Sequence, residues 1–215
     1  MKIISLLISF CFSIGNAHFD FPQHSNNLAK WNGGSAQSSI SQQLNPASIL
    51  MENHLSLSMN SLPENISSQS FIITHLMNDY ILKLNTSILD YGQLNDFITN
   101  NLFSAKDIVV GCSVKKEVKE VISVGIQFNF LNSKIGINSE NILKSSIGFR
   151  THLMCKRLGL GLSVHKYLNL NITSLGRKMD VIVGLFYKPL HLPGEIAIDI
   201  IKNDEIFGIL STQIK

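Results

Sequence analysis

The stretch that decides the fold is Ile122-Ser123-Val124-Gly125-Ile126-Gln127-Phe128-Asn129-Phe130. Its apolar residues occupy every second position, and Ser, Gly, Gln and Asn fill the positions between them. A period of two places the two sets on opposite faces of a pleated strand. The stretch therefore predicts a β-strand with one apolar face and one face of small, uncharged groups.

The same alternation recurs along the chain and predicts about ten strands. The expected strands are His54–Ser61, Gln69–Met77, Tyr80–Ile88, Ile108–Lys116, Ile122–Phe130, Ser145–Leu153, Leu158–His165, Asp180–Tyr187, Glu195–Ile201 and Glu205–Ile214. Short turn-rich links join them, including one expected over Asn132–Asn141. Parallel strands need crossovers of a dozen or more residues, so these links predict antiparallel hairpins.

The composition excludes several other classes of protein. Of the 215 residues, 45% are hydrophobic but only 15% are charged, and six Ala stand against 28 Ile. Scarce Ala disfavours a coiled coil, and after the first residues no apolar run reaches the ~18–20 residues of a spanning helix. The mean hydropathy of +0.19 is too high for a disordered tail. A net charge of +3 without a basic cluster gives no reason to expect nucleic acid.

The second strand face separates two all-β architectures. Its residues are mostly Ser, Gly, Asn and Gln, whereas a soluble sandwich usually carries Lys, Glu and Thr there. Many charges instead lie near the expected strand ends, at Lys115, Lys116, Arg157 and Lys188. Apolar-out, polar-in alternation is typical of a membrane barrel. We therefore predict an antiparallel up-and-down transmembrane β-barrel over residues 51–215, with a soluble periplasmic β-sandwich binding module as the alternative.

The first seventeen residues have the pattern of a secretory signal peptide. Lys2 precedes a short apolar run that ends in Gly15-Asn16-Ala17, which predicts cleavage after Ala17. Cys11 raises a lipoprotein alternative, but Phe10 is too large for the residue before a lipoprotein cysteine. The chain is therefore expected to be exported.

Residues 18–50 are expected to be an irregular N-terminal segment. Gly33-Gly34 permits backbone conformations closed to other residues, and Asn45-Pro46 is a turn dipeptide. Such a segment can run inside a barrel as a plug or lie on the surface as a strap, and the sequence leaves both open.

Four blocks of the chain together form a recognisable series. The first is the Gly33-Gly34-Ser35-Ala36 segment followed by Asn45-Pro46-Ala47, and the later ones are Leu89–Gly92, Val121–Lys134 and Gly184–Pro193. The first block resembles the opening before the first strand, and the later blocks resemble further strands and turns, of the PorV/PorQ family of FadL-like outer-membrane β-barrel proteins. Within that family, PorQ is nearer than PorV.

The resemblance implies a barrel in the outer membrane of a Gram-negative bacterium. It also implies a role in type IX secretion, in which PorV shuttles exported proteins and PorQ attaches them at the surface. The implied partners are outer-membrane lipid, other secretion-system proteins and exported proteins, without cofactor or catalysis. A FadL-like transporter of hydrophobic solutes is the runner-up. Family members have about fourteen strands, so the chain is expected to be shortened at its C-terminus.

Chemistry-bearing residues are few. No nucleophile elbow, phosphate loop or zinc-ligand spacing occurs, so no catalytic, cofactor-binding or metal site is expected. Arg150 and His152 share the polar face of one strand, where they are expected either to bind an anion or plug carboxylate or simply to pack in the lumen. Cys112 and Cys155 fall at apolar-facing strand positions, which favours free thiols over a disulfide. Four carboxylates are expected either at solvent-exposed strand ends, which is the favoured role, or in the lumen: Asp79, Asp90, Glu195 and Asp199.

Overall fold

The computed structural model describes most of the chain between residues 35 and 214. The described residues are 35–36, 44–61, 66–95, 102–118, 121–153, 157–171, 179–191, 194–202 and 206–214. The expected signal peptide, the Gly33-Gly34 pair and Cys155 lie outside them.

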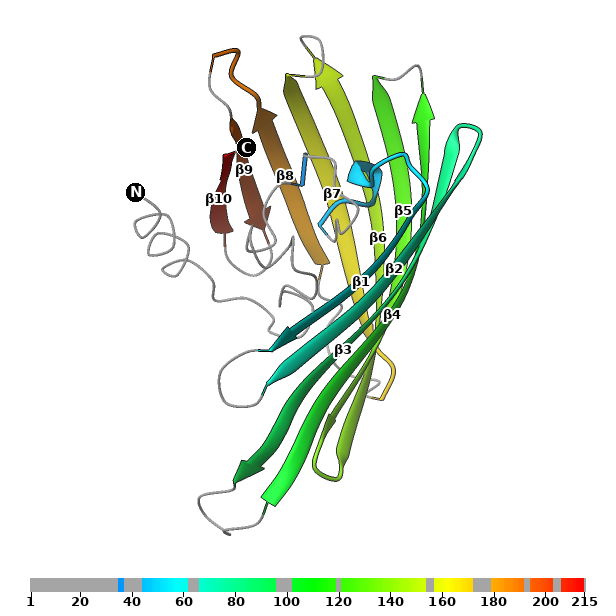
Figure 1. Ribbon diagram of the computed structural model, residues 1–215, viewed down its shortest axis with the longest axis vertical. Coiled ribbons are helices and arrows are strands. Elements are labelled where there is room, and N and C mark those ends of the chain that lie inside the picture. The colour runs from blue at the N-terminus through cyan, green and yellow to red at the C-terminus, as the bar shows by residue number, and fades with distance from the viewer. Residues whose placement is uncertain are drawn as a thin grey trace.

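Ten antiparallel strands form one sheet in which every strand pairs with its neighbours in sequence (Figure 1). The strands are β1 (His54–Ser61), β2 (Ser67–Met77), β3 (Tyr80–Asn95), β4 (Leu102–Val118), β5 (Ile122–Ile135), β6 (Asn138–Leu153), β7 (Leu158–Asn169), β8 (Met179–Tyr187), β9 (Gly194–Lys202) and β10 (Ile206–Ile214). This up-and-down order confirms the expected all-β class. Since the described strands belong to one sheet, they do not form the two packed layers of a sandwich.

All ten predicted strands are confirmed, and several are longer than expected. The predicted link over Asn132–Asn141 is wrong, because β5 continues to Ile135 and β6 begins at Asn138. Only a tight turn remains there, with Gly136 at φ 59°. The ladder pairs Asn132 with Asn141, and their side chains are hydrogen bonded. Backbone pairing needs no apolar side chain, so a strand continues where the alternation of hydrophobicity has ended.

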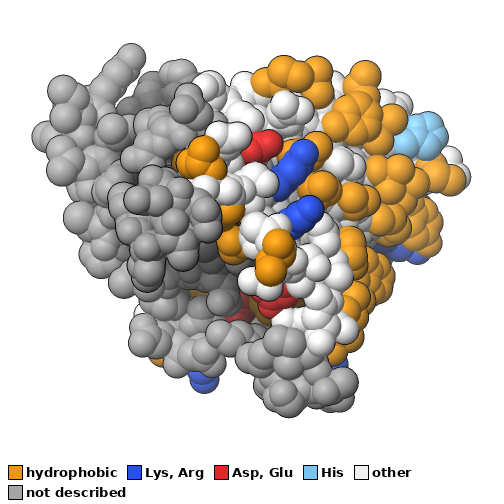
Figure 2. Space-filling view, turned by 90° about the horizontal axis from the view of Figure 1, so that it is seen from below, with side chains coloured by type: hydrophobic (Ala, Val, Ile, Leu, Met, Phe, Trp, Pro, Cys, Tyr) orange, Lys and Arg blue, Asp and Glu red, His pale blue; other side chains and the backbone are white. Residues whose placement is uncertain are grey.

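The sheet curls (Figure 1). Most of the side chains on its concave face are polar and buried, and most of those on its convex face are apolar and exposed. On β5, Ile126 is 46% exposed whereas its neighbour Gln127 is 1% exposed. Viewed from below, apolar side chains gather along the outer side of the molecule (Figure 2). The burial pattern is therefore the reverse of that of a water-soluble sheet.

A short 3-10 helix, η1 (Pro46–Ser48), lies on the concave face beside the upper parts of β5 and β6 (Figure 1). Further down the same face a small apolar cluster forms from Val109 and Leu131, with Ile142 and Tyr167 packed against it. No helix in the described part of the chain is long and apolar enough to cross a membrane. The interior of the curl thus contains part of the N-terminal segment and a mostly polar lining.

Candidate functional site

Two turns of the N-terminal segment rest on the concave face, and we call them the plug turns. One is Ser35–Ala36 and the other is Leu44–Ile49, which contains η1. The side chains of Ser35, Ala36, Asn45 and Ile49 are 0% exposed. The described part of the segment therefore lies inside the curl, as a plug would, and not on the outer surface as a strap.

Four glycines form the floor beneath the plug turns. Gly125 on β5 lies opposite Gly148 on β6, and Gly161 on β7 lies opposite Gly184 on β8. A Cβ atom on Gly125 would overlap the Pro46 backbone. One on Gly161 would lie 3.0 Å from the Ala36 Cα. The absence of side chains lets the backbone of the sheet and the backbone of the plug turns approach each other. We call this glycine floor, together with the polar residues around it, the seat.

Asn45 fixes the second plug turn. Its side-chain oxygen accepts a hydrogen bond from the Ala47 N–H at 2.9 Å, which caps η1. Its Nδ2 donates to the carbonyl of Phe149 on β6 at 3.0 Å. Pro46 follows at the first helical position, where its missing N–H costs nothing. The Asn45-Pro46-Ala47 motif is thus both a turn and a bridge to the sheet.

Charged and hydroxyl side chains form the rim of the seat. Asp199 on β9 accepts hydrogen bonds from the N–H of Ser35, at 2.9 Å, and from its hydroxyl. Arg150 on β6 donates from Nε to the carbonyl of Ala36 at 2.7 Å. Ser163 on β7 donates to the carbonyl of Leu44 at 2.6 Å. Most of these bonds reach backbone atoms of the plug turns, so the seat recognises main chain more than side chains.

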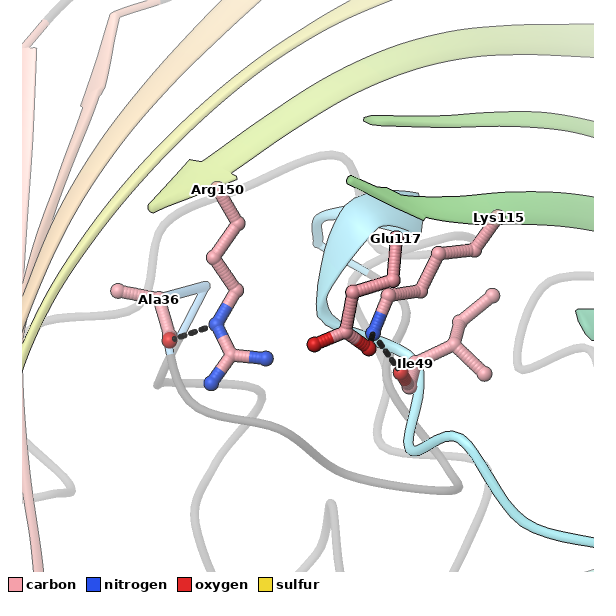
Figure 3. Close-up of polar contacts among 5 residues, drawn as sticks. All are labelled: Ala36, Ile49, Lys115, Glu117 and Arg150. Atoms are coloured by element: carbon pink, nitrogen blue, oxygen red, sulfur yellow. Dashed lines mark hydrogen bonds and ion pairs between the residues drawn. The ribbon is translucent and has the colours of Figure 1, made fainter. Parts of the chain in front are cut away.

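A lysine and a glutamate complete the rim on β4. Lys115 donates to the carbonyl of Ile49 at 2.8 Å and lies 3.8 Å from the Glu117 carboxylate. Figure 3 shows the Glu117 carboxylate between the Arg150 guanidinium and the Lys115 ammonium. Alternating charges reduce the cost of burying two cations side by side.

A second polar feature crosses the concave face beside the row of Lys115, Gly125, Gly148 and Ser163, two residues away from each of them. We call this row of ladder partners the polar belt. Its members are Thr74, Lys83, Ser113, Gln127, Ser146, His165 and Asp180. All seven are buried, and His165 bonds through Nδ1 to the Ser146 hydroxyl at 2.6 Å. The belt gives the interior of the curl a polar lining below the plug turns.

The residues predicted from the sequence as site candidates lie in different parts of the structure. Arg150 lies on the concave face as expected, and its Nε donates to the carbonyl of Ala36 in the first plug turn. His152 is on the same face as Arg150, two residues further along β6, and pairs with Gly159 of β7. Cys112 lies on the convex face between Leu84 and Phe128 in the ladders and is a free thiol. Among the described residues, no group of three or more His, Cys, Asp or Glu could hold a metal ion.

The expected solvent-exposed strand end is wrong for Asp199, which is 0% exposed. Asp199 instead has the interior position that was the less favoured alternative, and the sequence could not decide between the two because the carboxylate is buried by a segment more than 160 residues away. The glycine floor was also missed as a site. Its signal was present, since all four glycines occupy polar-face positions, but only the strand register places them side by side. No protein-family model matches the chain, and neither a search of curated proteins nor a search of solved structures finds a similar protein.

Proposed function

We propose that this chain is a non-enzymatic β-barrel protein of the bacterial outer membrane, of the PorV/PorQ type. One observation carries the membrane assignment: the curled sheet exposes its apolar face and buries its polar face. Convex residues such as Leu57, at 68%, and Ile147, at 62%, are exposed along several strands. Soluble monomers rarely expose contiguous apolar patches of more than a few hundred Å². Hydrocarbon is the solvent that favours this face.

The plug turns bear on the kind of barrel. The plug turns fill part of the interior and are held there by buried hydrogen bonds to Asp199, Arg150 and Lys115. A plugged barrel suits a protein that acts through its ends and loops better than an open pore. Together with the resemblance described above, this supports a role in protein export or in the surface attachment of exported proteins.

Native Cys112 provides a direct test of the membrane assignment. We would express the full chain with Cys155→Ser, isolate outer membranes and add a membrane-impermeant maleimide. Cys112 is expected to stay unlabelled in membranes and to react after denaturation, because lipid covers the convex face. Ile137→Cys, at a turn position that is 98% exposed, is the matched accessible control when combined with Cys112→Ser.

Rapid labelling of Cys112 in the folded chain, or recovery of the chain wholly in the soluble periplasm, would contradict the proposal. Heat-modifiable migration on gels is expected in addition, since folded barrels resist detergent. The secretion role is tested separately by deleting the gene and measuring exported proteins at the cell surface. Unchanged surface proteins would remove that role and leave the barrel assignment standing.

A second candidate function is the passage of hydrophobic solutes. It is favoured by the apolar cluster of Val109, Leu131, Ile142 and Tyr167 on the concave face. The polar belt separates this cluster from the seat, so transport requires a path that crosses buried polar groups. Uptake of a fatty acid by liposomes containing the protein, lost in Leu131→Asp, would select this candidate over the first.

A further inference from the structure

The two edges of the sheet are the feature that the proposed function leaves unexplained. In the described sheet, β1 and β10 each pair on one side only (Figure 1). Both carry exposed apolar residues, such as Leu57 and Leu210. In lipid, each unpaired N–H or C=O costs several kcal/mol, so a barrel wall tolerates no free edge. The inference below rests on the proposed membrane location.

The stagger of the strands can be read from the ladders. A line drawn perpendicular to the strands passes through ladder partners, beginning at His54, the first residue of β1, and running along the polar belt. It crosses β5 at Gln127, near the middle of that strand, and β8 at Asp180, its second residue.

Since β1 and β8 run in opposite directions, the two crossings lie at opposite ends of the sheet. Beyond β8 the line passes one position beyond the last residue of β9 and one position before the first residue of β10, because Lys202 pairs with Ile206 and with Val181, the residue after Asp180. The strands therefore shift by about one residue per strand against the perpendicular, always in the same direction.

This shift is the one that a closed barrel needs. In a barrel, a perpendicular line followed once round returns to its first strand displaced by the shear number. One residue per strand over ten strands gives a shear of about ten. With a rise of ~3.3 Å per residue and ~4.8 Å between strands, the strand tilt is then about 35°, at the lower limit of the ~35–45° of known barrels.

We propose that β1 and β10 of the same chain pair with each other in the membrane, with a shear of ten. This register places Met59 opposite Leu210 and Asn60 opposite Ile209. Met59 and Leu210 are both convex and exposed, whereas Asn60 and Ile209 are both partly buried on the concave side. The two edge strands are antiparallel to each other because the number of strands is even. In this register the paired residues lie on the same face, the two strands are antiparallel, and the displacement equals the stagger measured across the sheet.

Closure at ten strands has a functional consequence. Eight-stranded barrels are just wide enough to be filled by side chains, and aqueous channels appear at about sixteen to eighteen strands. A ten-stranded interior holds little beyond its lining and the plug turns. The partners of this protein are then reached from the ends of the barrel and not through it.

Disulfide trapping tests the register in the full chain. Residues directly opposite in an antiparallel pair have Cα atoms about 4.5–5.5 Å apart, within the range that a disulfide spans. Met59→Cys with Leu210→Cys, in a Cys112→Ser, Cys155→Ser background, would be oxidised in outer membranes with copper phenanthroline. Met59→Cys with Gln69→Cys, which are ladder partners on β1 and β2, is the positive control. Met59→Cys with Ile206→Cys, four residues out of register, is the negative control.

The expected result is an intramolecular disulfide in most chains for Met59–Leu210, similar to the positive control, and little for Met59–Ile206. Disulfide-linked dimers would show that a second copy pairs with the edge and would overturn closure within one chain. No cross-link in membrane-bound chains that form the control disulfide would also overturn it, leaving the membrane assignment intact. Recovery of the chain in the soluble fraction would instead overturn the proposed function.

Discussion

The convex and concave faces of the sheet use the same strands for opposite purposes. On the convex face, large aliphatic and aromatic side chains stand exposed and make few contacts with the rest of the chain. On the concave face, glycines, hydroxyls and a few charges are buried against the plug turns. The contacts that hold the plug turns therefore lie on the polar face, whereas the apolar face is exposed to whatever surrounds the sheet. Single substitutions can alter one face at a time.

The largest effect is expected from adding volume to the seat. In Gly148→Val, the new side chain would overlap Asn45 and approach Pro46, so the second plug turn must leave the floor. We expect a loss of about 3 kcal/mol or more in the free energy of unfolding, since the obstacle includes backbone. Urea unfolding in lipid vesicles measures it.

Gly208→Val is the matched control for that variant, because a Cβ on Gly208 meets nothing within 4 Å. It should unfold at nearly the wild-type urea concentration. Equal destabilisation by the two variants would mean that replacing any strand glycine has this effect and that contact with the plug turns contributes nothing.

The next largest effect is expected from a charge on the convex face. Ile126→Lys places an ammonium group at the middle of β5, where a lipid-facing lysine costs about 2–4 kcal/mol. Ile137→Lys, at the exposed β5–β6 turn, should cost less than about 0.5 kcal/mol. The readout is the fraction of heat-modifiable, folded protein after refolding into vesicles. A tolerated Ile126→Lys would indicate that water and not lipid covers this face.

A smaller loss is expected from removing the carboxylate under the first plug turn. Asp199→Ala leaves the buried N–H and hydroxyl of Ser35 without their acceptor. Hydrogen bonds to charged groups contribute about 1.5–3 kcal/mol, so we expect about 2 kcal/mol lower stability. Faster proteolysis within residues 18–50, with the strands intact, would locate the effect.

Asp199→Asn is the isosteric comparison for the same contact. It keeps one acceptor oxygen and should recover about half of the loss, since a neutral hydrogen bond is about half as strong as a charge-assisted one. If Asp199→Ala is cleaved at the same rate as the wild-type chain, the carboxylate has no role in holding the plug turns.

The smallest effect is expected at Ser163. Ser163→Ala removes the hydrogen bond to the carbonyl of Leu44 and the 3.2 Å contact with His165 Nε2, and should lower the free energy of unfolding by about 1 kcal/mol. Combined with Asp199→Ala in a double-mutant cycle, it should show a positive coupling energy if the two plug turns dock as one unit. Strict additivity would indicate that they dock independently.

Much of the fold was predictable because it depends on local periodicity. All ten strands were located from alternation alone, and the polar face was identified by its Ser, Gly and Asn content. The strand ends were less predictable, as the Asn132–Asn141 link shows, since polar residues on both faces remove the alternation while the ladder continues. Of the candidate residues, Asn45 bonds to the carbonyl of Phe149, the residue before Arg150, although no local signal linked the two parts of the chain.

The sequence by itself determined an all-β chain with one apolar and one polar strand face, because side-chain alternation is a property of neighbouring residues. Only the tertiary structure decided which glycines form one floor, why Asp199 is buried, and that Lys115 and Arg150 hold the plug turns. These facts depend on strand register and on contacts between residues as many as 164 positions apart, as in the Ser35–Asp199 pair. Local patterns carry no information about such distances. The fold class was therefore encoded locally, whereas the site came into existence only when the sheet curled around the N-terminal segment.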